Sequence, residues 1–160
     1  MELLFEETSY IYNIKWHRPV LYDKFIKEGS EHDYDSYFYM IIGRYGKSYP
    51  KLFYIGKTYR QVVSVRLTQK DHVARYKFLC KEYPRHKLYV VCSEIIMEDT
   101  QIRSRRVDEV ETLLIYSNDC ETLINKSKLI YITNKDQYMI RNSGHYKPLH
   151  KNLFYGVTSF

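Results

Sequence analysis

The sequence has few cysteines and no long apolar run, and each absence excludes a class of protein. Three cysteines occur in 160 residues, Cys80, Cys92 and Cys120, and their odd number and spacing fit neither a CxxC metal site nor a disulfide framework. We therefore expect free thiols in a reducing compartment. No run approaches the ~20 apolar residues that span a bilayer, and the start lacks the basic region of a signal peptide. The sequence predicts a soluble, intracellular (cytoplasmic) protein without a membrane partner.

Basic charge and tyrosine are what the chain has in excess. The formal net charge is +6, and 18 residues are Tyr. A basic surface attracts polyanions over long range, and tyrosine rings can stack on bases, although any single tyrosine is more often a residue at the boundary of the core. Nucleic acid is therefore the leading candidate partner. An anionic membrane surface is the main competitor, but no basic amphipathic helix of convincing length is visible.

Two short runs rich in aromatic and branched residues, 37–42 and 52–55, predict the strands of a β-hairpin. The loop between them, 43–50, holds two Gly, a Ser and a Pro, which are turn residues. The first run is apolar on both faces, which indicates a central strand covered on both sides. Tyr39 and Tyr54 converge only if the hairpin register puts them on the same face.

Beyond the hairpin, apolar spacing predicts a helical segment at 60–82 with room for a break near Lys70 and Asp71, a strand at 86–96 and a helix at 101–117. On the last helix, Glu111 falls inside the apolar stripe. A carboxylate in that position costs free energy unless it meets a cation or a metal, so Glu111 is the first functional candidate. The alternative is a structural ion pair with Arg66 or a lysine.

The order and spacing of these features resemble the GIY-YIG nuclease superfamily. Residues 37–41 are similar to its first motif, with Tyr37 where Gly usually stands, and residues 54–58 contain its second motif letter for letter. Three later positions match the helix arginine, the glutamate and the asparagine of the family: Arg66, Glu111 and Asn125.

The resemblance implies an α/β fold in which helices flank a three-stranded mixed, largely antiparallel sheet. This core would occupy 37–126, between an N-terminal extension at 1–36 and a C-terminal extension at 127–160. The N-terminal extension mixes basic and aromatic residues, so it either packs on the core or contacts DNA. Within the C-terminal extension, the basic, turn-rich stretch at 141–151 is either a loop that contacts nucleic acid or a surface crossover.

The resemblance also implies metal-dependent hydrolysis of phosphodiester bonds. One carboxylate, that of Glu111, suits Mg²⁺ or Mn²⁺ when waters and the substrate phosphate complete the shell. Arg66 would brace the phosphate oxygens, Tyr39 would act as base or water-positioner, and Tyr54 would be a hydrogen-bonding partner. Because ionising a free tyrosine at pH 7 costs about 4 kcal/mol, cations such as Lys57 would have to lower the tyrosine pKa or neutralise the phosphate.

The resemblance assigns supporting roles to Gly56 and to Asn125, which would brace the site from behind the glutamate. A position after the helix arginine also departs from the family. Many members place a histidine four residues after the helix arginine, where this chain has Lys70, and His72 follows two residues later. On a continuous helix this rotates the histidine by about 200°. Either the helix bends near Asp71 and His72 reaches the site, or Lys70 contacts phosphate, and a lone histidine is more often structural.

Several basic side chains outside this set are candidates for DNA contact, with a solvated basic face as the alternative: Lys70, Arg103, Arg105, Arg106 and Lys147. Together these features predict a restriction-like, sequence-specific DNA endonuclease, working as a homodimer on a palindromic site. Two alternatives stay open. One is a nucleic-acid-binding protein on the same fold that does not cut, and the other is a structure-specific repair or recombination nuclease. The presence of the tyrosine, the arginine and the glutamate favours an enzyme.

Overall fold

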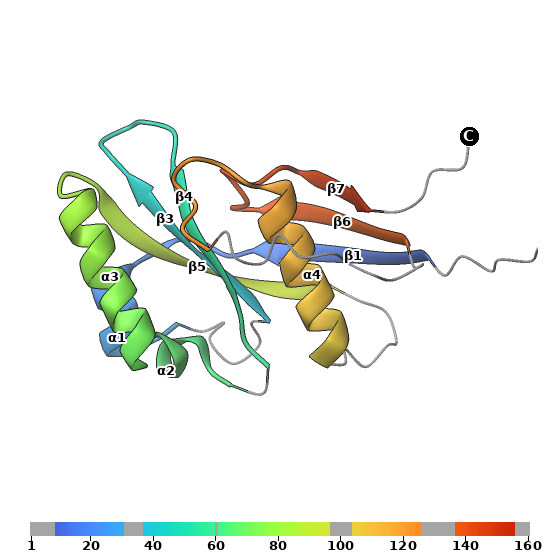
Figure 1. The fold of residues 1–160 in the computed structure, drawn as a ribbon, viewed down its shortest axis with the longest axis horizontal. Coiled ribbons are helices and arrows are strands. Elements are labelled where there is room, and N and C mark those ends of the chain that lie inside the picture. The colour runs from blue at the N-terminus through green and yellow to red at the C-terminus, as the bar shows by residue number, and fades with distance from the viewer. Residues whose placement is uncertain (1–8, 31–36, 60, 97–103, 126–136, 156–160) are drawn as a thin grey trace, which may run out of the picture.

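The computed structural model describes residues 9–30, 37–59, 61–96, 104–125 and 137–155 (Figure 1). The strands are β1 (Ser9–Trp16), β2 (Val20–Leu21), β3 (Phe38–Arg44), β4 (Lys51–Lys57), β5 (Lys87–Ile96), β6 (Gln137–Gly144) and β7 (Asn152–Tyr155). The helices are α1 (Tyr22–Glu28), α2 (Val63–Leu67), α3 (Lys70–Glu82) and α4 (Ser104–Ser117). None of these helices is long and apolar enough to cross a membrane.

The strands of the described residues form one curled, seven-stranded mixed sheet in the order β4-β3-β5-β1-β6-β7, with β2 paired to β5 off this path. The pairs are antiparallel except for β1 and β6, which are parallel. The fold is α/β, but the prediction of a three-stranded sheet is wrong. The predicted strands correspond to β3, β4 and β5, and the sheet continues into β1, β6 and β7, which come from the stretches expected to be extensions.

Strand β1 forms because large side chains alternate along it. Tyr12, Ile14 and Trp16 are buried on one face, whereas Ile11 and Lys15 are exposed on the other. Strand β6 lies parallel to β1 along its whole length. Parallel strands need a long crossover between them, and this pairing joins segments from near the two ends of the described chain.

The sheet has a hydrophobic core on each face. Phe38, Met40 and Ile55 belong to the core under α4, and Tyr39 and Ile41 belong to the core under α1, α2 and α3. Figure 1 shows these three helices gathered at one end of the sheet, with α4 standing apart from them. Strand β3 is therefore buried on both faces, as its composition predicted.

A chain of buried hydrogen bonds fixes α4 to the β1–β6 half of the sheet. The Trp16 indole donates to Asn142 Oδ1 (2.9 Å), and the Asn142 amide donates to the His150 carbonyl (2.8 Å). The backbone N–H of His150 then donates to Asn118 Oδ1 (2.8 Å), just beyond the end of α4. Because buried polar groups are costly when unpaired, this chain specifies where α4 ends.

The helix predicted at 60–82 is two helices, and the break falls at Thr68 and Gln69 rather than near Asp71. The Thr68 hydroxyl and N–H both bond to the Val65 carbonyl (2.7 and 3.2 Å), which ends α2 in a tight turn. Helix α3 therefore starts in a new direction at Lys70.

The outer edge of β4 is covered by residues that follow α4. The Ile124 N–H donates to the Phe53 carbonyl (2.8 Å). The Asn125 side chain accepts from the Ile55 N–H (3.3 Å) and donates to the Ile55 carbonyl. These contacts satisfy backbone groups that an edge strand would otherwise leave open.

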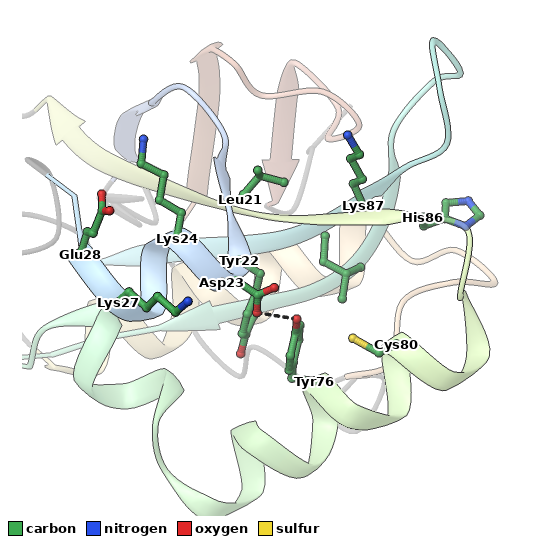
Figure 2. Close-up of a pocket in the computed structure, with 11 residues that line it drawn as sticks. Leu21, Tyr22, Asp23, Lys24, Lys27, Glu28, Tyr76, Cys80, His86 and Lys87 are labelled. Atoms are coloured by element: carbon green, nitrogen blue, oxygen red, sulfur yellow. Dashed lines mark hydrogen bonds between the residues drawn. The ribbon is translucent and has the colours of Figure 1, made fainter.

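A cavity of about 520 Å³ opens between α1, α3 and the start of β5 (Figure 2). A second cavity of about 260 Å³ lies between α1 and the junction of α2 with α3. Tyr22 and Tyr76 line both cavities, which therefore adjoin.

Candidate active site

The hairpin register brings Tyr39 and Tyr54 to the same face of the sheet. Tyr39 is paired with Gly56 across the two strands, and Ile41 with Tyr54. The two tyrosine ring centroids lie 5.9 Å apart. The Tyr39 ring lies across Gly56, where a Cβ would overlap the hydroxyl end of the ring. A glycine at position 56 therefore leaves the room that Tyr39 occupies.

The Tyr39 hydroxyl is buried and makes no hydrogen bond of good geometry among the described residues, although the side chains of Tyr54 and Arg66 lie within its reach. Burial raises the pKa of this hydroxyl well above its ordinary value of 10, Tyr54 raises it further, and Arg66 lowers it. Arg66 comes from α2, and its Nε is also buried without a hydrogen bond of good geometry in the described part of the chain. The two groups therefore lie close together with hydrogen-bonding capacity that a ligand could use.

His72 lies beside Tyr54 and is only 2% exposed, with the two ring centroids 6.0 Å apart in an edge-on contact. The break between α2 and α3 lets it reach this position. An Arg75 Nη atom donates to His72 Nδ1 (2.6 Å), which leaves the ring proton on Nε2. Burial lowers the pKa of His72 to about 4, Arg75 and Arg66 lower it as well, and Asp71 opposes them. The imidazole is therefore neutral at pH 7.

Arg75 is the residue that joins these groups. Its guanidinium lies over the Tyr54 ring, 3.9 Å from the centroid, while it donates to His72. The nearby carboxylate is that of Asp71, which is largely exposed and 3.8 Å from His72 Nε2. We call Tyr39, Tyr54, Arg66, His72 and Arg75 the tyrosine–arginine cluster. Its two guanidinium groups and two phenols suit an oxyanion such as phosphate.

Glu111, a residue of α4, lies on the other face of the sheet and is 4% exposed. Lys57 pairs closely with Asp108, one turn earlier on α4, and its Nζ lies 3.9 Å from Glu111 Oε2. Arg66 is the cation that lowers the Tyr39 pKa, and Lys57 contacts the carboxylates of α4.

The two groups adjoin the same end of β4. Gly56 contacts the Tyr39 ring, and the next residue, Lys57, contacts the carboxylates of α4. Since successive Cα atoms are about 3.8 Å apart, contacts from the cluster and from α4 reach neighbouring residues of β4, on opposite faces of the sheet.

The side chains available as metal ligands suit a magnesium ion better than a zinc ion. Within the described ranges, no three His, Cys, Asp or Glu side chains gather to hold a metal. Glu111 offers one buried carboxylate, and its neighbour Lys57 is held mainly by Asp108. A single carboxylate fits Mg²⁺ or Mn²⁺, which keeps several waters and takes substrate oxygens.

The predicted supporting residue Asn125 acts on β4 itself. It bonds to the backbone of Ile55, which lies between Tyr54 and Gly56. The side chain therefore fixes the strand that carries the second motif, whereas the expectation was support from behind Glu111.

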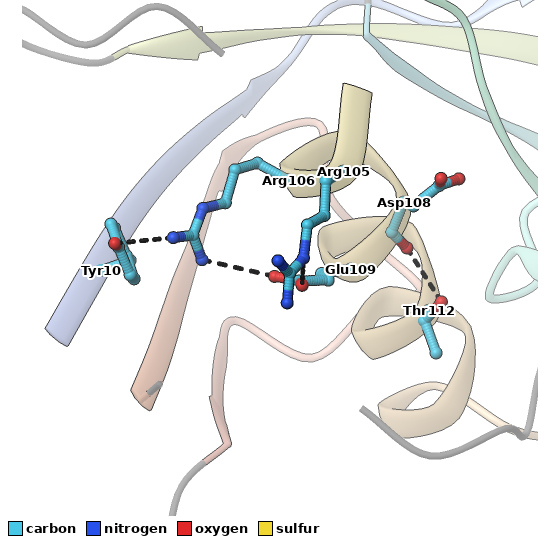
Figure 3. A network of polar contacts seen from close by, with 6 residues as sticks. All are labelled: Tyr10, Arg105, Arg106, Asp108, Glu109 and Thr112. Carbon is cyan, nitrogen blue, oxygen red and sulfur yellow. Dashed lines mark hydrogen bonds and ion pairs between the residues drawn. The ribbon is translucent and has the colours of Figure 1, made fainter. Parts of the chain in front are cut away.

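Arg105 and Arg106, on α4, form a separate network of polar contacts (Figure 3). Arg105 Nε and Arg106 Nη1 donate to the two Glu109 oxygens (3.0 and 3.4 Å). Arg106 Nη2 also donates to the Tyr10 hydroxyl (2.6 Å). These contacts hold α4 against β1. Lys70 and Lys147 are exposed, and Arg103 lies outside the described residues.

Sequence reasoning missed two residues of the site. Arg75 follows His72 by three residues, so on a helix the two share a face, and that spacing could have identified it. Asp108 precedes Glu111 by the same interval, but its pairing with Lys57 depends on the end of β4 lying beside α4. No local pattern indicates that contact.

No protein-family model, curated protein or solved structure matches the chain. The function is therefore argued from the motifs quoted above and from the contacts of the chain's own residues.

Proposed function

We propose that this chain is a metal-dependent endonuclease of the GIY-YIG type that hydrolyses phosphodiester bonds in DNA. The observation that carries the proposal is a pair of neighbouring buried groups, Arg66 Nε and the Tyr39 hydroxyl, neither of which makes a hydrogen bond of good geometry among the described residues. They lie with Arg75 and a neutral His72 in a cluster rich in donors. A phosphate group would supply the acceptors that these donors lack.

Two arginines would bind the substrate phosphate. Arg66 would donate from its buried Nε to a non-bridging oxygen, where a charge-assisted bond is strong because water is excluded. Arg75 would add positive charge from above Tyr54, since its guanidinium is stacked on that ring. Negative charge that develops on phosphorus is then met by groups already in place.

Tyr39 would orient the attacking water and remain protonated. Its pKa is raised by burial and by Tyr54, so ionising it would cost more than the roughly 4 kcal/mol of a free tyrosine at pH 7. A neutral phenol can still hold a water through its oxygen. Of the two roles that the resemblance implies for Tyr39, the raised pKa favours that of water-positioner.

Glu111 would hold the divalent cation, with Lys57 kept aside by Asp108. The metal, when bound, would stabilise charge on the phosphate and on the leaving oxygen. Asn125 and Gly56 would contribute by fixing the end of β4 between the two groups.

Cleavage of supercoiled DNA in Mg²⁺, in Mn²⁺ and in EDTA tests the proposal. We expect metal-dependent cutting by the natural protein and none by Glu111→Gln, which should bind DNA as well or better because a metal ligand is lost and no phosphate contact is. Glu109→Gln is the matched control, since Glu109 is on the same helix but pairs with Arg105 and Arg106. It should cut normally.

Equal cutting by Glu111→Gln would rule out the metal assignment. A protein that shifts DNA in a gel but cuts nothing under any metal condition would instead be a nucleic-acid-binding protein on this fold. Discrete bands would indicate a sequence-specific enzyme, and nicking or smearing would indicate recognition of structure.

A further inference from the structure

We propose that the groove between α1 and α3 binds one nucleotide of the strand that flanks the scissile phosphate. The inference rests on the proposed function, because it places the substrate's continuation beyond the tyrosine–arginine cluster. The groove contains the cavity of about 520 Å³ described above (Figure 2). That volume is in the range of small-molecule sites and suits a single nucleotide.

The walls of the groove combine an aromatic plane with an unused hydroxyl. Tyr22 and Tyr76 stack with ring centroids 4.1 Å apart and planes within 6° of parallel. The Tyr76 hydroxyl donates to Asp23 Oδ1 (2.8 Å), as Figure 2 shows. The Tyr22 hydroxyl is buried and has no partner in the described residues. The outer face of Tyr76, which is partly exposed, could take a base by stacking.

The rim of the groove carries three lysines: Lys24 and Lys27 on α1 and Lys87 at the start of β5. All three are exposed, and no ion pair among the described residues includes them. Two carboxylates, Asp23 and Glu28, also line the groove, and Asp23 is engaged by Tyr76. The unpaired lysines favour an anionic occupant, and phosphates on either side of a stacked base meet that requirement.

Continuity with the cluster gives the occupant its identity. Arg75 lies over Tyr54 in the cluster, and the next residue of α3, Tyr76, stacks on Tyr22 in the groove. The smaller cavity, which shares Tyr22 and Tyr76 with the groove, is also lined by Leu67, the neighbour of Arg66. A DNA strand whose phosphate contacts Arg66 could continue into the groove. A free small molecule bound in the groove would not also contact the cluster.

Cys80 reports on the groove directly, because it lines the cavity and is an exposed free thiol. The probe is a fluorescein-labelled single-stranded DNA of about 10 nucleotides, within the usual site size for such strands. Binding of the probe is monitored by fluorescence anisotropy. At a saturating probe concentration, we expect alkylation of Cys80 by iodoacetamide to slow by on the order of tenfold, because the bound nucleotide would cover the thiol. Cys120, which lies outside the groove and is partly exposed, is the internal control and should react unchanged.

Charge variants separate the groove from general electrostatic attraction. Changing Lys24, Lys27 and Lys87 together to Gln should reduce the salt dependence of probe binding by roughly two in log–log slope, since each contact to a single strand contributes about 0.7. The matched control removes the same charge from exposed positions at the turn between β3 and β4, outside the groove and outside the stretches considered for DNA contact, by changing Arg44, Lys47 and Lys51 to Gln. It should retain the natural slope and the protection of Cys80.

The inference is overturned if the probe binds and Cys80 reacts at its free rate, if both triple variants lose the same slope, or if the probe does not bind. The proposed function fails separately. Should the probe protect Cys80 while Mg²⁺ and Mn²⁺ support no cleavage, the groove remains a nucleic-acid site and the nuclease proposal is withdrawn.

Discussion

At the scale of single residues, the chemistry depends on how burial changes the pKa and the hydrogen bonding of each polar group. On a continuous helix, the place of His72 two positions after Lys70 would point its side chain away from the site. In the structure, His72 is buried against Tyr54, and its Nδ1 accepts a hydrogen bond from Arg75. The sequence could suggest a histidine near the site, but its protonation state follows from burial and from Arg75.

The lowered pKa of His72 makes a prediction about stability. The folded state holds the imidazole neutral with a pKa of about 4, below the ordinary value of 6.5. Stability is therefore complete above pH 6.5 and is lost as the pH falls from 6.5 towards 4, because the unfolded chain takes up the proton first. The shift corresponds to about 3 kcal/mol at most.

Urea unfolding at pH 7.5 and pH 4.5 measures this loss. His72→Gln keeps an acceptor for Arg75 and removes the titration, so its stability should change less between the two pH values than that of the natural protein. His145→Gln, at an exposed position, should behave like the natural protein. An equal pH dependence in all three proteins would show that His72 is not the group that titrates.

At the scale of elements, the site is organised by the end of β4. The hairpin and the apolar stripe of α4 were predictable, because alternating and helical periodicities are local signals. They placed Tyr39, Tyr54 and Glu111 on the elements that carry them. The way Asn125 closes the edge of β4 was not predictable, because it depends on a backbone contact between residues 70 positions apart.

The bonds of Asn125 to Ile55 predict the effect of an isosteric change. Asn125→Asp keeps the acceptor for the Ile55 N–H and loses the donor to the Ile55 carbonyl. We expect a loss of about 1–3 kcal/mol in stability and faster hydrogen exchange at the Ile55 amide, together with slower cleavage.

Asn118→Asp is the control for that variant. Asn118 has the same pattern, with a donor to the Leu114 carbonyl and an acceptor for the His150 N–H, but it lies at the far end of α4. This change should destabilise the protein without exposing the Ile55 amide. If both variants speed exchange at Ile55 equally, Asn125 has no particular role in holding β4.

At the scale of the whole molecule, the prediction failed on the size of the sheet. Residues 10–16 carry large side chains at every second position, which is a strand signal, but they precede both motifs, and the resemblance therefore places them in an extension of the core. The parallel pairing of β1 with β6 has no local signal, since the two strands are joined through most of the chain. The missed half of the sheet fixes α4 through Trp16 and Asn142, and so determines where Glu111 lies.

The most direct test of one composite site is a double-mutant cycle on cleavage under single-turnover conditions, using Arg66→Ala, Glu111→Gln and the double variant. Each single change should slow cleavage by about 10²–10³-fold or more, as loss of transition-state stabilisation does. Residues that act on the same step are not additive, so the double variant should be no slower than the slower single variant. Rate losses that multiply, or an Arg66→Ala protein altered in DNA affinity alone, would contradict a shared site on the two sides of β4.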